Sequence, residues 1–172
     1  MNGSIRHQLA FAVVTALACT TASVALAGGS GADTCGVMGL TPSTAESALR
    51  GGATVSPSQP RAGETACTIT PTDKARHTTI RVVVVAAESL ADRIEGDVYE
   101  RPSATRAMRG LGSGAVLLRF DYRGHVDEHV WFEAGPFGVE VTSEAPGGSL
   151  ASLHETTGRA LAVARAIYAH LA

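Results

Sequence analysis

A run of β-branched residues constrains this chain more than any other stretch of its sequence. Residues 79–87 read TIRVVVVAA, with four consecutive valines after Ile80 and Arg81. β-Branched side chains have few χ1 rotamers and pack well on a pleated surface, so the run predicts a strand. Because its apolar residues do not alternate with polar ones, we expect both faces of this strand to be covered. The valine strand is therefore predicted to lie inside a sheet, with the other elements packed around it.

Amphipathic and alternating patterns on either side of the valine strand predict an α+β domain. Helical spacing is found over residues 42–50, 89–101 and 150–171, and strand patterns over residues 64–70, 116–122, 126–132 and 137–144. Together with the valine strand, these segments give the order α-β-β-α-β-β-β-α. Because most of the strands follow one another through short turns, we expect an antiparallel sheet of about five strands, packed by the helices.

Local signals indicate where some of these elements begin and what lies between them. Thr41 is expected to cap the first helix, with Pro42 as its first helical residue. Ser89 is expected to cap the second helix. Residues 55–63 contain two prolines and are predicted to form an exposed loop, and residues 109–114 (RGLGSG) to form a glycine-rich turn.

The last helix, residues 150–171, carries a long apolar stripe at helical spacing, and Ser149 is expected to cap it. Glu155 and Arg159 lie one turn apart and are predicted to pair on its solvent side. Gly158 costs about 1 kcal/mol relative to alanine in a helix interior, unless the helix must approach the sheet closely at that point.

The pair of strands around Arg123 and Gly124 is predicted to form a hairpin. Gly124 is expected to take a left-handed conformation in a three-residue loop with a bulge. That loop sets Arg119 opposite Asp127 in the expected register. On the other face, it sets residues 116, 118 and 120 opposite residues 130, 128 and 126, respectively.

The N-terminal segment predicts export. Residues 9–18 are apolar and uncharged but too short to span a bilayer, and residues 25–27 read Ala-Leu-Ala, an A-x-A cleavage site. We therefore expect a signal peptide over residues 1–27, a flexible Gly/Ser leader over residues 28–34 and a single α+β domain over residues 35–172. A competing interpretation takes Cys19 as the lipidated first residue, because Ala-Leu-Ala also precedes it in a loose lipobox.

The cysteines predict a cross-link in the mature chain. Conventional cleavage removes Cys19 and leaves Cys35 and Cys67. An exported domain lies in an oxidising compartment, where two thiols generally pair. We expect a structural Cys35–Cys67 disulfide that fastens the first helix to the sheet; the alternative is two separately buried free thiols.

Few residues suggest chemistry. His125, Asp127 and His129 share a strand face, but the two imidazoles are about 13 Å apart along a strand, too far for one ion to bridge without a bend. We therefore expect exposed hairpin residues there. Ser113 lies in a glycine loop that matches neither the dinucleotide-binding fingerprint nor the nucleophile elbow. We predict no catalytic residues, no metal ligands and no cofactor. The net charge of -2, without a basic stripe, argues against a nucleic-acid partner.

The order of several short motifs resembles a known family. These are the signal with its loose lipobox, Cys35 followed by LTPSTAESALRGG, Cys67 after a Pro/Gly-rich loop, the valine strand, residues 108–117 (MRGLGSGAVL) and the Ala-rich last helix. This arrangement resembles the DUF3558-type secreted proteins and lipoproteins of high-GC Gram-positive bacteria. The resemblance implies a non-enzymatic or unknown role in the envelope and supplies no catalytic residues.

The function predicted from these features is that of an exported binding or interaction module of the cell envelope or extracellular space, without enzymatic activity. Its partner would be an envelope protein or a small ligand, and it would contact a membrane only through a lipid on Cys19. The protein would be secreted, or alternatively anchored by that lipid to the outer face of the cell membrane. The alternative function is that of a small secreted hydrolase or metal-dependent enzyme.

Overall fold

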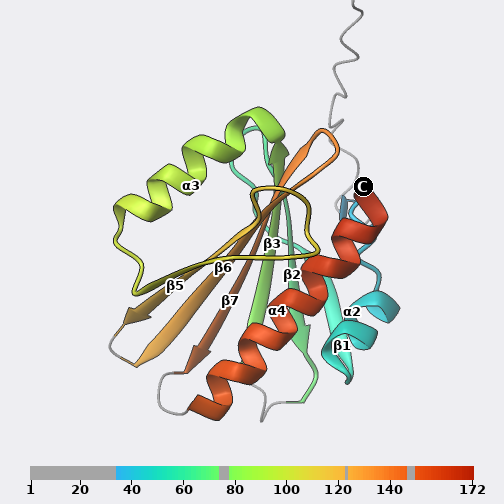
Figure 1. Cartoon of the computed structure of the whole chain (residues 1–172). Helices are drawn as coiled ribbons and strands as arrows, with labels where there is room; N and C mark the ends of the chain where they lie inside the picture. The colour runs from blue at the N-terminus through green and yellow to red at the C-terminus, as the bar shows by residue number, and fades with distance from the viewer. Residues whose placement is uncertain (1–33, 74–77, 123, 147–149) are drawn as a thin grey trace, which may run out of the picture.

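The fold is a seven-stranded antiparallel sheet with helices on both faces (Figure 1). The computed structural model describes residues 34–73, 78–122, 124–146 and 150–172. The sheet has the order β1-β2-β3-β7-β6-β5-β4. Its elements are α1 (Thr34–Val37), α2 (Pro42–Leu49), β1 (Ala53–Pro57), β2 (Thr65–Pro71), β3 (Thr79–Ala86), α3 (Leu90–Tyr99), β4 (Ala104–Ala107), β5 (Val116–Tyr122), β6 (His125–Ala134), β7 (Phe137–Pro146) and α4 (Leu150–Leu171). The predicted signal peptide, including Cys19, nearly all of the leader, and Ser149 lie outside the described residues.

The α+β class and the antiparallel sheet are confirmed, but the predicted number of strands was too low. Two strands were missed, and both are edge strands of the sheet. β1 pairs with β2 and overlaps the segment predicted as an exposed loop. β4 pairs with β5, and all four of its residues are exposed. An edge strand with little buried surface needs no apolar alternation, so its sequence lacks the pattern by which strands are recognised.

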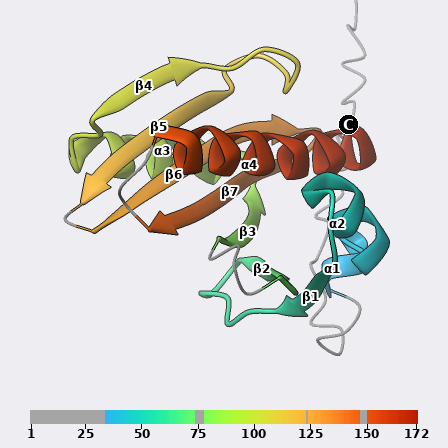
Figure 2. The ribbon, with the colours of Figure 1, turned by 90° about the horizontal axis from the view of Figure 1, so that it is seen from below.

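The valine strand is an interior strand whose two faces are both buried, as predicted. Val82 and Val84 point into the main core, and Val83 and Val85 lie on the opposite face. β3 pairs with β2 on one side and β7 on the other. Figure 2 shows α4 along one face of the sheet, with α1 and α2 beside it. α3 contacts β6 and packs Leu90 on the opposite face.

The core on the α4 face is large, and the core on the α3 face is small. The α4 face contributes apolar side chains from nearly every element, including Ile80, Val130, Phe132, Val141 and Ile167. On the α3 face, a patch of four buried residues joins that helix to the sheet: Leu90, Leu118, Phe120 and Trp131. Much of the remaining α3 face of β6 and β7 is polar. The two faces therefore differ in character, and polar chemistry is concentrated on the α3 side.

The Cys35–Cys67 disulfide is present, as predicted. It joins α1 to β2, and both cysteines are buried in the main core. The Cα atoms are 5.9 Å apart, within the usual range for a disulfide. The bond therefore fastens the beginning of the described chain to the interior of the sheet.

The predicted helix caps had mixed outcomes. Thr41 accepts a hydrogen bond from the backbone N–H of Thr44, and Pro42 begins α2, as expected. Ser89 was wrongly predicted to cap α3. It has helical dihedral angles and makes no capping bond, because a 3₁₀ turn over Ala87–Ser89 already leads into the helix. The chain thus enters α3 already wound, so no side-chain cap forms at that position.

The predicted hairpin register was wrong by one residue. Arg119 lies opposite Glu128 rather than Asp127, and Tyr122 lies opposite His125. Only two residues separate that last pair, so the loop is shorter than the bulged loop we expected. Gly124 does have a positive φ, 97°. The one-residue shift sets Val116 opposite Trp131 and places Glu128 on the α4 face, where it is buried.

The glycine-rich turn after β4 supports the α4 face. Gly110, Gly112 and Gly114 all have φ near +80°, a region that side chains other than glycine rarely adopt. Between them, Leu111 is fully buried in the main core, and Ser113 is exposed. The turn is thus a structural loop, as the glycine pattern indicated, and it inserts one leucine into the core.

Among the described helices, none combines the length and apolarity that a bilayer crossing requires.

Candidate functional site

Three titratable side chains from three different elements meet on the α3 face of the sheet. Asp97 comes from the last turn of α3, His129 from β6 and Glu140 from β7. Nδ1 of His129 lies 2.8 Å from Oδ2 of Asp97 and 3.1 Å from Oε1 of Glu140. We call these three residues the His129 cluster.

Two neutral side chains orient the carboxylates of the His129 cluster. The indole N–H of Trp131 donates to Oδ2 of Asp97 at 2.9 Å. The hydroxyl of Thr142 donates to Oε1 of Glu140 at 2.9 Å. Both donors are on β6 and β7, the strands that carry His129 and Glu140, and Trp131 is buried in the patch beneath α3. The carboxylates are therefore held in place by the sheet and do not depend on His129 alone.

The surroundings of His129 favour its protonated form. Burial alone would lower the pKa of this imidazole, because it removes water from the cation. Hydrogen bonds to Asp97 and Glu140 outweigh that effect and raise the pKa of His129 from 6.5 to about 9. At neutral pH, and in the absence of another cation, His129 is thus an imidazolium between two carboxylates.

A groove of about 460 Å³ opens beside the His129 cluster. We call it the sheet-face groove; its charged lining comes from Arg61, Glu64, Arg81, Arg93, Asp97, Glu100, His129 and Glu140. Its lining thus carries cations and anions close together. An arrangement of this kind suits a small ligand with charges of both signs, or an anion held next to a cation.

One wall of the sheet-face groove is fixed by a buried carboxylate. The side chain of Glu64 is 2% exposed and pairs with Arg93 of α3, and it accepts a hydrogen bond from the backbone N–H of Arg61 at 3.0 Å. Burial raises the pKa of Glu64, but Arg93 and the Arg61 N–H outweigh it, and the net pKa is lowered. Glu64 is therefore ionised, and with Arg93 it ties α3 to the region before β2.

A second cluster of similar composition lies further along the same face. It contains His125, Asp127 and Glu144, whose ligand atoms lie within 4.8 Å of one another. Asp127 is paired with Glu144 across the strands. Burial raises the pKa of Asp127, and the Glu144 carboxylate adds to this increase, while His125 and His129 oppose it. His125 Nε2 is 3.9 Å from Asp127, and the imidazole side chain remains 40% exposed.

The structure corrects the expectation for His129. We expected both histidines to be exposed, but only 19% of the His129 side chain is accessible. The two imidazoles share a face, as predicted, yet each joins a different cluster. No single ion has to bridge them, because the partners of His129 come from α3 and β7.

Asp97 and Glu140 were absent from the predicted site, and the sequence contained a signal only for Asp97. Asp97 is seven residues after Leu90 and three after Ile94, so it lies on the helix face that packs on the sheet. Glu140 lies between Val139 and Val141 on a strand buried on both faces, and it is 8% exposed. A charged residue on a buried face usually has a partner, so the position of Asp97 indicated an ionic contact, whereas alternation along residues 137–144 places Glu140 on the strand face expected to be polar.

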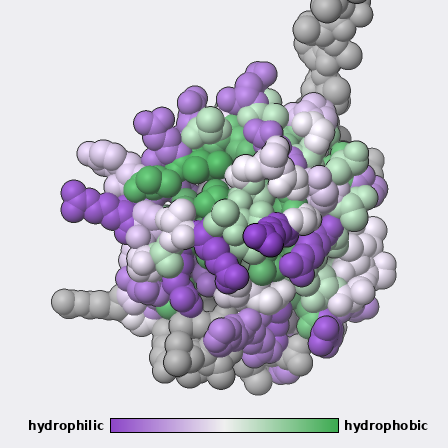
Figure 3. All heavy atoms as spheres, viewed as in Figure 1, coloured by the Kyte–Doolittle hydropathy of each residue, from purple (hydrophilic) through white to green (hydrophobic). Residues whose placement is uncertain are grey.

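The α4 face offers a smaller pocket. It has a volume of about 220 Å³ and lies between α4 and the β4–β5 edge. Glu128 at its base is 2% exposed and accepts hydrogen bonds from the hydroxyl of Thr157. Figure 3 shows hydrophobic surface on this side of the molecule, interrupted by hydrophilic side chains. The Glu128 carboxylate is already hydrogen-bonded to Thr157 and lies 3.6 Å from Nε of Arg119, so this smaller pocket is the weaker candidate.

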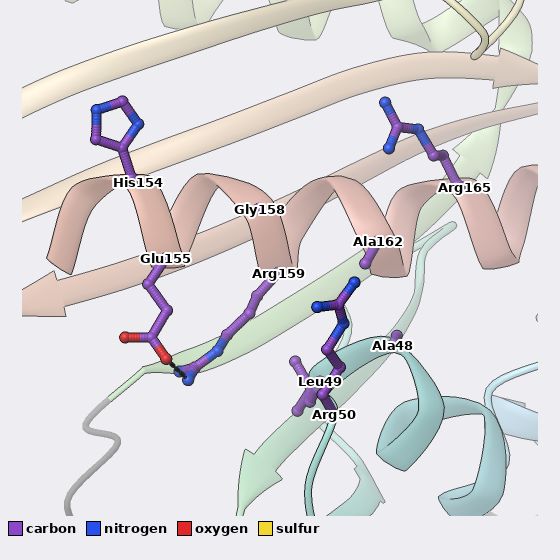
Figure 4. A pocket seen from close by; sticks show the side chains of 9 residues that line it. All are labelled: Ala48, Leu49, Arg50, His154, Glu155, Gly158, Arg159, Ala162 and Arg165. Carbon is purple, nitrogen blue, oxygen red and sulfur yellow. Dashed lines mark hydrogen bonds and ion pairs between the residues drawn. The ribbon is translucent and has the colours of Figure 1, made fainter. Parts of the chain in front are cut away.

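A third hollow lies between α2 and α4, with basic residues along it (Figure 4). Arg159 pairs with Glu155, as predicted, but only Glu155 is exposed to solvent, because Arg159 is buried. His154 and Arg165 leave α4 on the side away from α2, while Arg50 lies between the two helices (Figure 4). The cations therefore do not converge on one point, and this hollow is not a defined anion site.

Comparison with known proteins adds a structural likeness. No protein-family model matches the sequence, and no curated protein matches it. The structure is similar to the crystal structure of a GTP binding regulator from Thermotoga maritima, with 11% sequence identity and a TM-score of 0.41. The match covers 77% of this chain and 90% of the other.

Proposed function

We propose that this protein is an exported binding module of the cell envelope or extracellular space and has no catalytic activity. The observation that carries the proposal is the Cys35–Cys67 disulfide. Such bonds persist in oxidising compartments and are rare in the cytosol. The proposal keeps the sequence-based expectations of a cleaved signal over residues 1–27, or a lipid on Cys19, and of a DUF3558-like relationship.

The sheet-face groove is the proposed binding surface. Arg61, Arg81 and Arg93 line it together with carboxylates, and Arg81 is 41% exposed. A mixed lining of this kind recognises a small charged ligand or a charged segment of an envelope protein. Residues whose contacts hold α3 against the sheet also line this groove, so ligand binding and the packing of α3 on the sheet are coupled.

Two measurements on the expressed protein test the proposal. Intact-mass analysis of protein from the medium and from membranes should give a chain that begins at Gly28, or a lipid-modified chain that begins at Cys19. Thiol counting on the unfolded, unreduced mature protein should find no free thiol at Cys35 or Cys67. A chain that retains Met1 and is found only inside the cell, with two free thiols, would overturn the proposal.

A second function, that of a small metal-dependent secreted enzyme, is favoured by one observation. The His129 cluster brings an imidazole and two carboxylates together at the edge of a groove, as catalytic metal sites do. An enzyme of this class must turn over a substrate and lose that activity in a chelator. Activity of the purified protein on model esters, phosphoesters or peptides, lost with EDTA and restored by a metal ion, would select this function over the first.

A further inference from the structure

We propose that Asp97, His129 and Glu140 form a binding site for one divalent transition-metal ion, such as Zn²⁺ or Mn²⁺. The inference does not depend on export or on the absence of catalysis, because it rests on the geometry of the three ligand atoms. The three groups come from α3, β6 and β7, so the complete ligand set exists only in the folded protein.

The spacing of the ligand atoms fits a metal ion. The two nitrogen–oxygen distances in the His129 cluster are 2.8 Å and 3.1 Å. With bonds of about 2.1 Å and angles between 90° and 110°, two ligands of one metal are separated by about 3.0–3.4 Å. The pairs need to move by only a few tenths of an ångström to become edges of a coordination polyhedron.

The number of protons in the His129 cluster also favours a dication. Nδ1 of an imidazole carries at most one hydrogen, yet it faces two carboxylate oxygens. That hydrogen serves both acceptors only by being shared between them. Two carboxylates and an imidazolium carry a net charge of −1. Two carboxylates, a neutral imidazole and a dication are neutral and give each ligand atom a direct bond.

The donor set selects the class of metal. An imidazole nitrogen together with carboxylate oxygens suits Zn²⁺ and Mn²⁺, whereas Mg²⁺ and Ca²⁺ prefer oxygen ligands alone. Trp131 and Thr142 already donate hydrogen bonds to the ligating carboxylate oxygens. Groups of this kind, one bond removed from the metal, orient the ligands and usually contribute to affinity.

The sheet-face groove leaves one side of the site accessible. Asp97, His129 and Glu140 all belong to its lining, so an ion can enter and keep positions for water or an exogenous ligand. Arg81 lines the same groove and is 41% exposed. A metal ion there would extend the groove's capacity toward ligands that carry a carboxylate or phosphate group.

The chain contains a natural reporter for this site. Trp131 is the only tryptophan, and its indole N–H is 2.9 Å from Oδ2 of Asp97. Bound Mn²⁺ at the cluster would lie within several ångströms of that proton and broaden its NMR signal by paramagnetic relaxation. The measurement needs no substitution, so it remains valid even if a cluster variant fails to fold.

The experiment uses the mature disulfide-bonded chain, stripped of metal with EDTA and dialysed. Calorimetric titration at pH 7.5 should show one Zn²⁺ or Mn²⁺ per chain, with a dissociation constant in the micromolar range or below, and no comparable binding of Mg²⁺. Asp97→Asn and Glu140→Gln should each weaken binding at least tenfold, and His129→Ala should abolish it. His125→Ala is the matched control, since it removes an imidazole from the second cluster and should leave the affinity unchanged.

Three results would overturn the inference. One is no stoichiometric binding of Zn²⁺ or Mn²⁺ by the wild-type protein. Another is a sharp Trp131 indole signal at one equivalent of bound Mn²⁺, which would place the ion elsewhere. The third is affinity lost in His125→Ala but kept in a folded His129→Ala variant, which would assign the ion to the second cluster.

Discussion

Removing the Cys35–Cys67 bond should lower the stability of the domain by a predictable amount. The two cysteines are 32 residues apart in the sequence, and the chain-entropy relation for a loop of that length gives about 3.7 kcal/mol at 25 °C. A domain of this size has a total stability of about 5–15 kcal/mol, so the bond supplies a substantial fraction. Reduction opens the S–S bond but leaves all heavy atoms of both buried cysteines in the protein. The change in unfolding free energy on reduction therefore reports the cross-link itself.

The measurement is urea unfolding of the mature protein with and without a reductant strong enough to open the buried bond, with thiol counting to confirm its state. We expect the unfolding free energy to fall by about 3–4 kcal/mol, and the melting temperature to fall by roughly 10 °C. The Cys35→Ala/Cys67→Ala variant should resemble the reduced protein and should not respond to reductant. Equal unfolding free energies for the oxidised and reduced protein would refute the argument that this bond fastens α1 to the sheet.

Three further predictions concern the two faces of the sheet. In metal-free protein, the pKa of His129 is about 9 in the folded state against 6.5 in the unfolded state, so its contribution to stability is complete below pH 6.5 and is lost as the pH rises through 9. The urea midpoint of the wild-type protein should therefore fall across that pH range, and a flat profile would contradict this prediction. Gly138→Ala should destabilise the domain by about 1–3 kcal/mol, because a Cβ there would lie 3.0 Å from Leu90. At Gly158 a Cβ would meet nothing within 4 Å, so Gly158→Ala should stabilise α4 by about 0.5–1 kcal/mol in thermal melts. Leu118→Ala should cost about 2–5 kcal/mol in the same assay, while the 89% exposed Tyr99 should tolerate alanine within about 0.5 kcal/mol.

The interior of the fold was predictable from the sequence because burial imposes a pattern. The valine run, the alternation in β7 and the long apolar stripe of α4 all reflect side chains that meet the core. β1 and β4 bury little at the sheet edges, and their sequences carry no such pattern. The register of β5 and β6 was missed for a related reason. Apolar residues on both faces of these strands left two neighbouring registers equally acceptable, and the turn length decided between them.

The candidate site was only half predictable, because its members are distant in sequence. By local spacing, the expected neighbours of His129 are His125 and Asp127 on the same strand. Its actual partners are Asp97, 32 residues earlier, and Glu140 on the next strand. Strand pairing sets Glu140 beside Trp131, and the direction of α3 brings Asp97 over both. Neither placement follows from periodicity, although Asp97 on the buried face of α3 indicated that a partner existed.

The position of α3 depends on charged contacts as well as on apolar packing. Leu90 and Ile94 make the apolar contact, while Arg93 pairs with Glu64 and Asp97 pairs with His129. Arg93 and Asp97 are four residues apart, so both ionic contacts lie on one side of the helix. Buried ion pairs seldom add stability over a well-packed apolar alternative, so stability alone does not account for them.

The location of the two ionic contacts of α3 accounts for their presence more directly. Arg93, Asp97 and their partners Glu64 and His129 line the sheet-face groove, so a ligand bound there would lie next to the groups that hold α3 against the sheet. A cation bound at the proposed site in place of the His129 proton would keep Asp97 attached to the sheet through the metal, and an anion that competed for Arg93 would loosen its link to Glu64. We therefore expect a ligand in this groove to affect the position of α3, whereas α4 packs over the large apolar core.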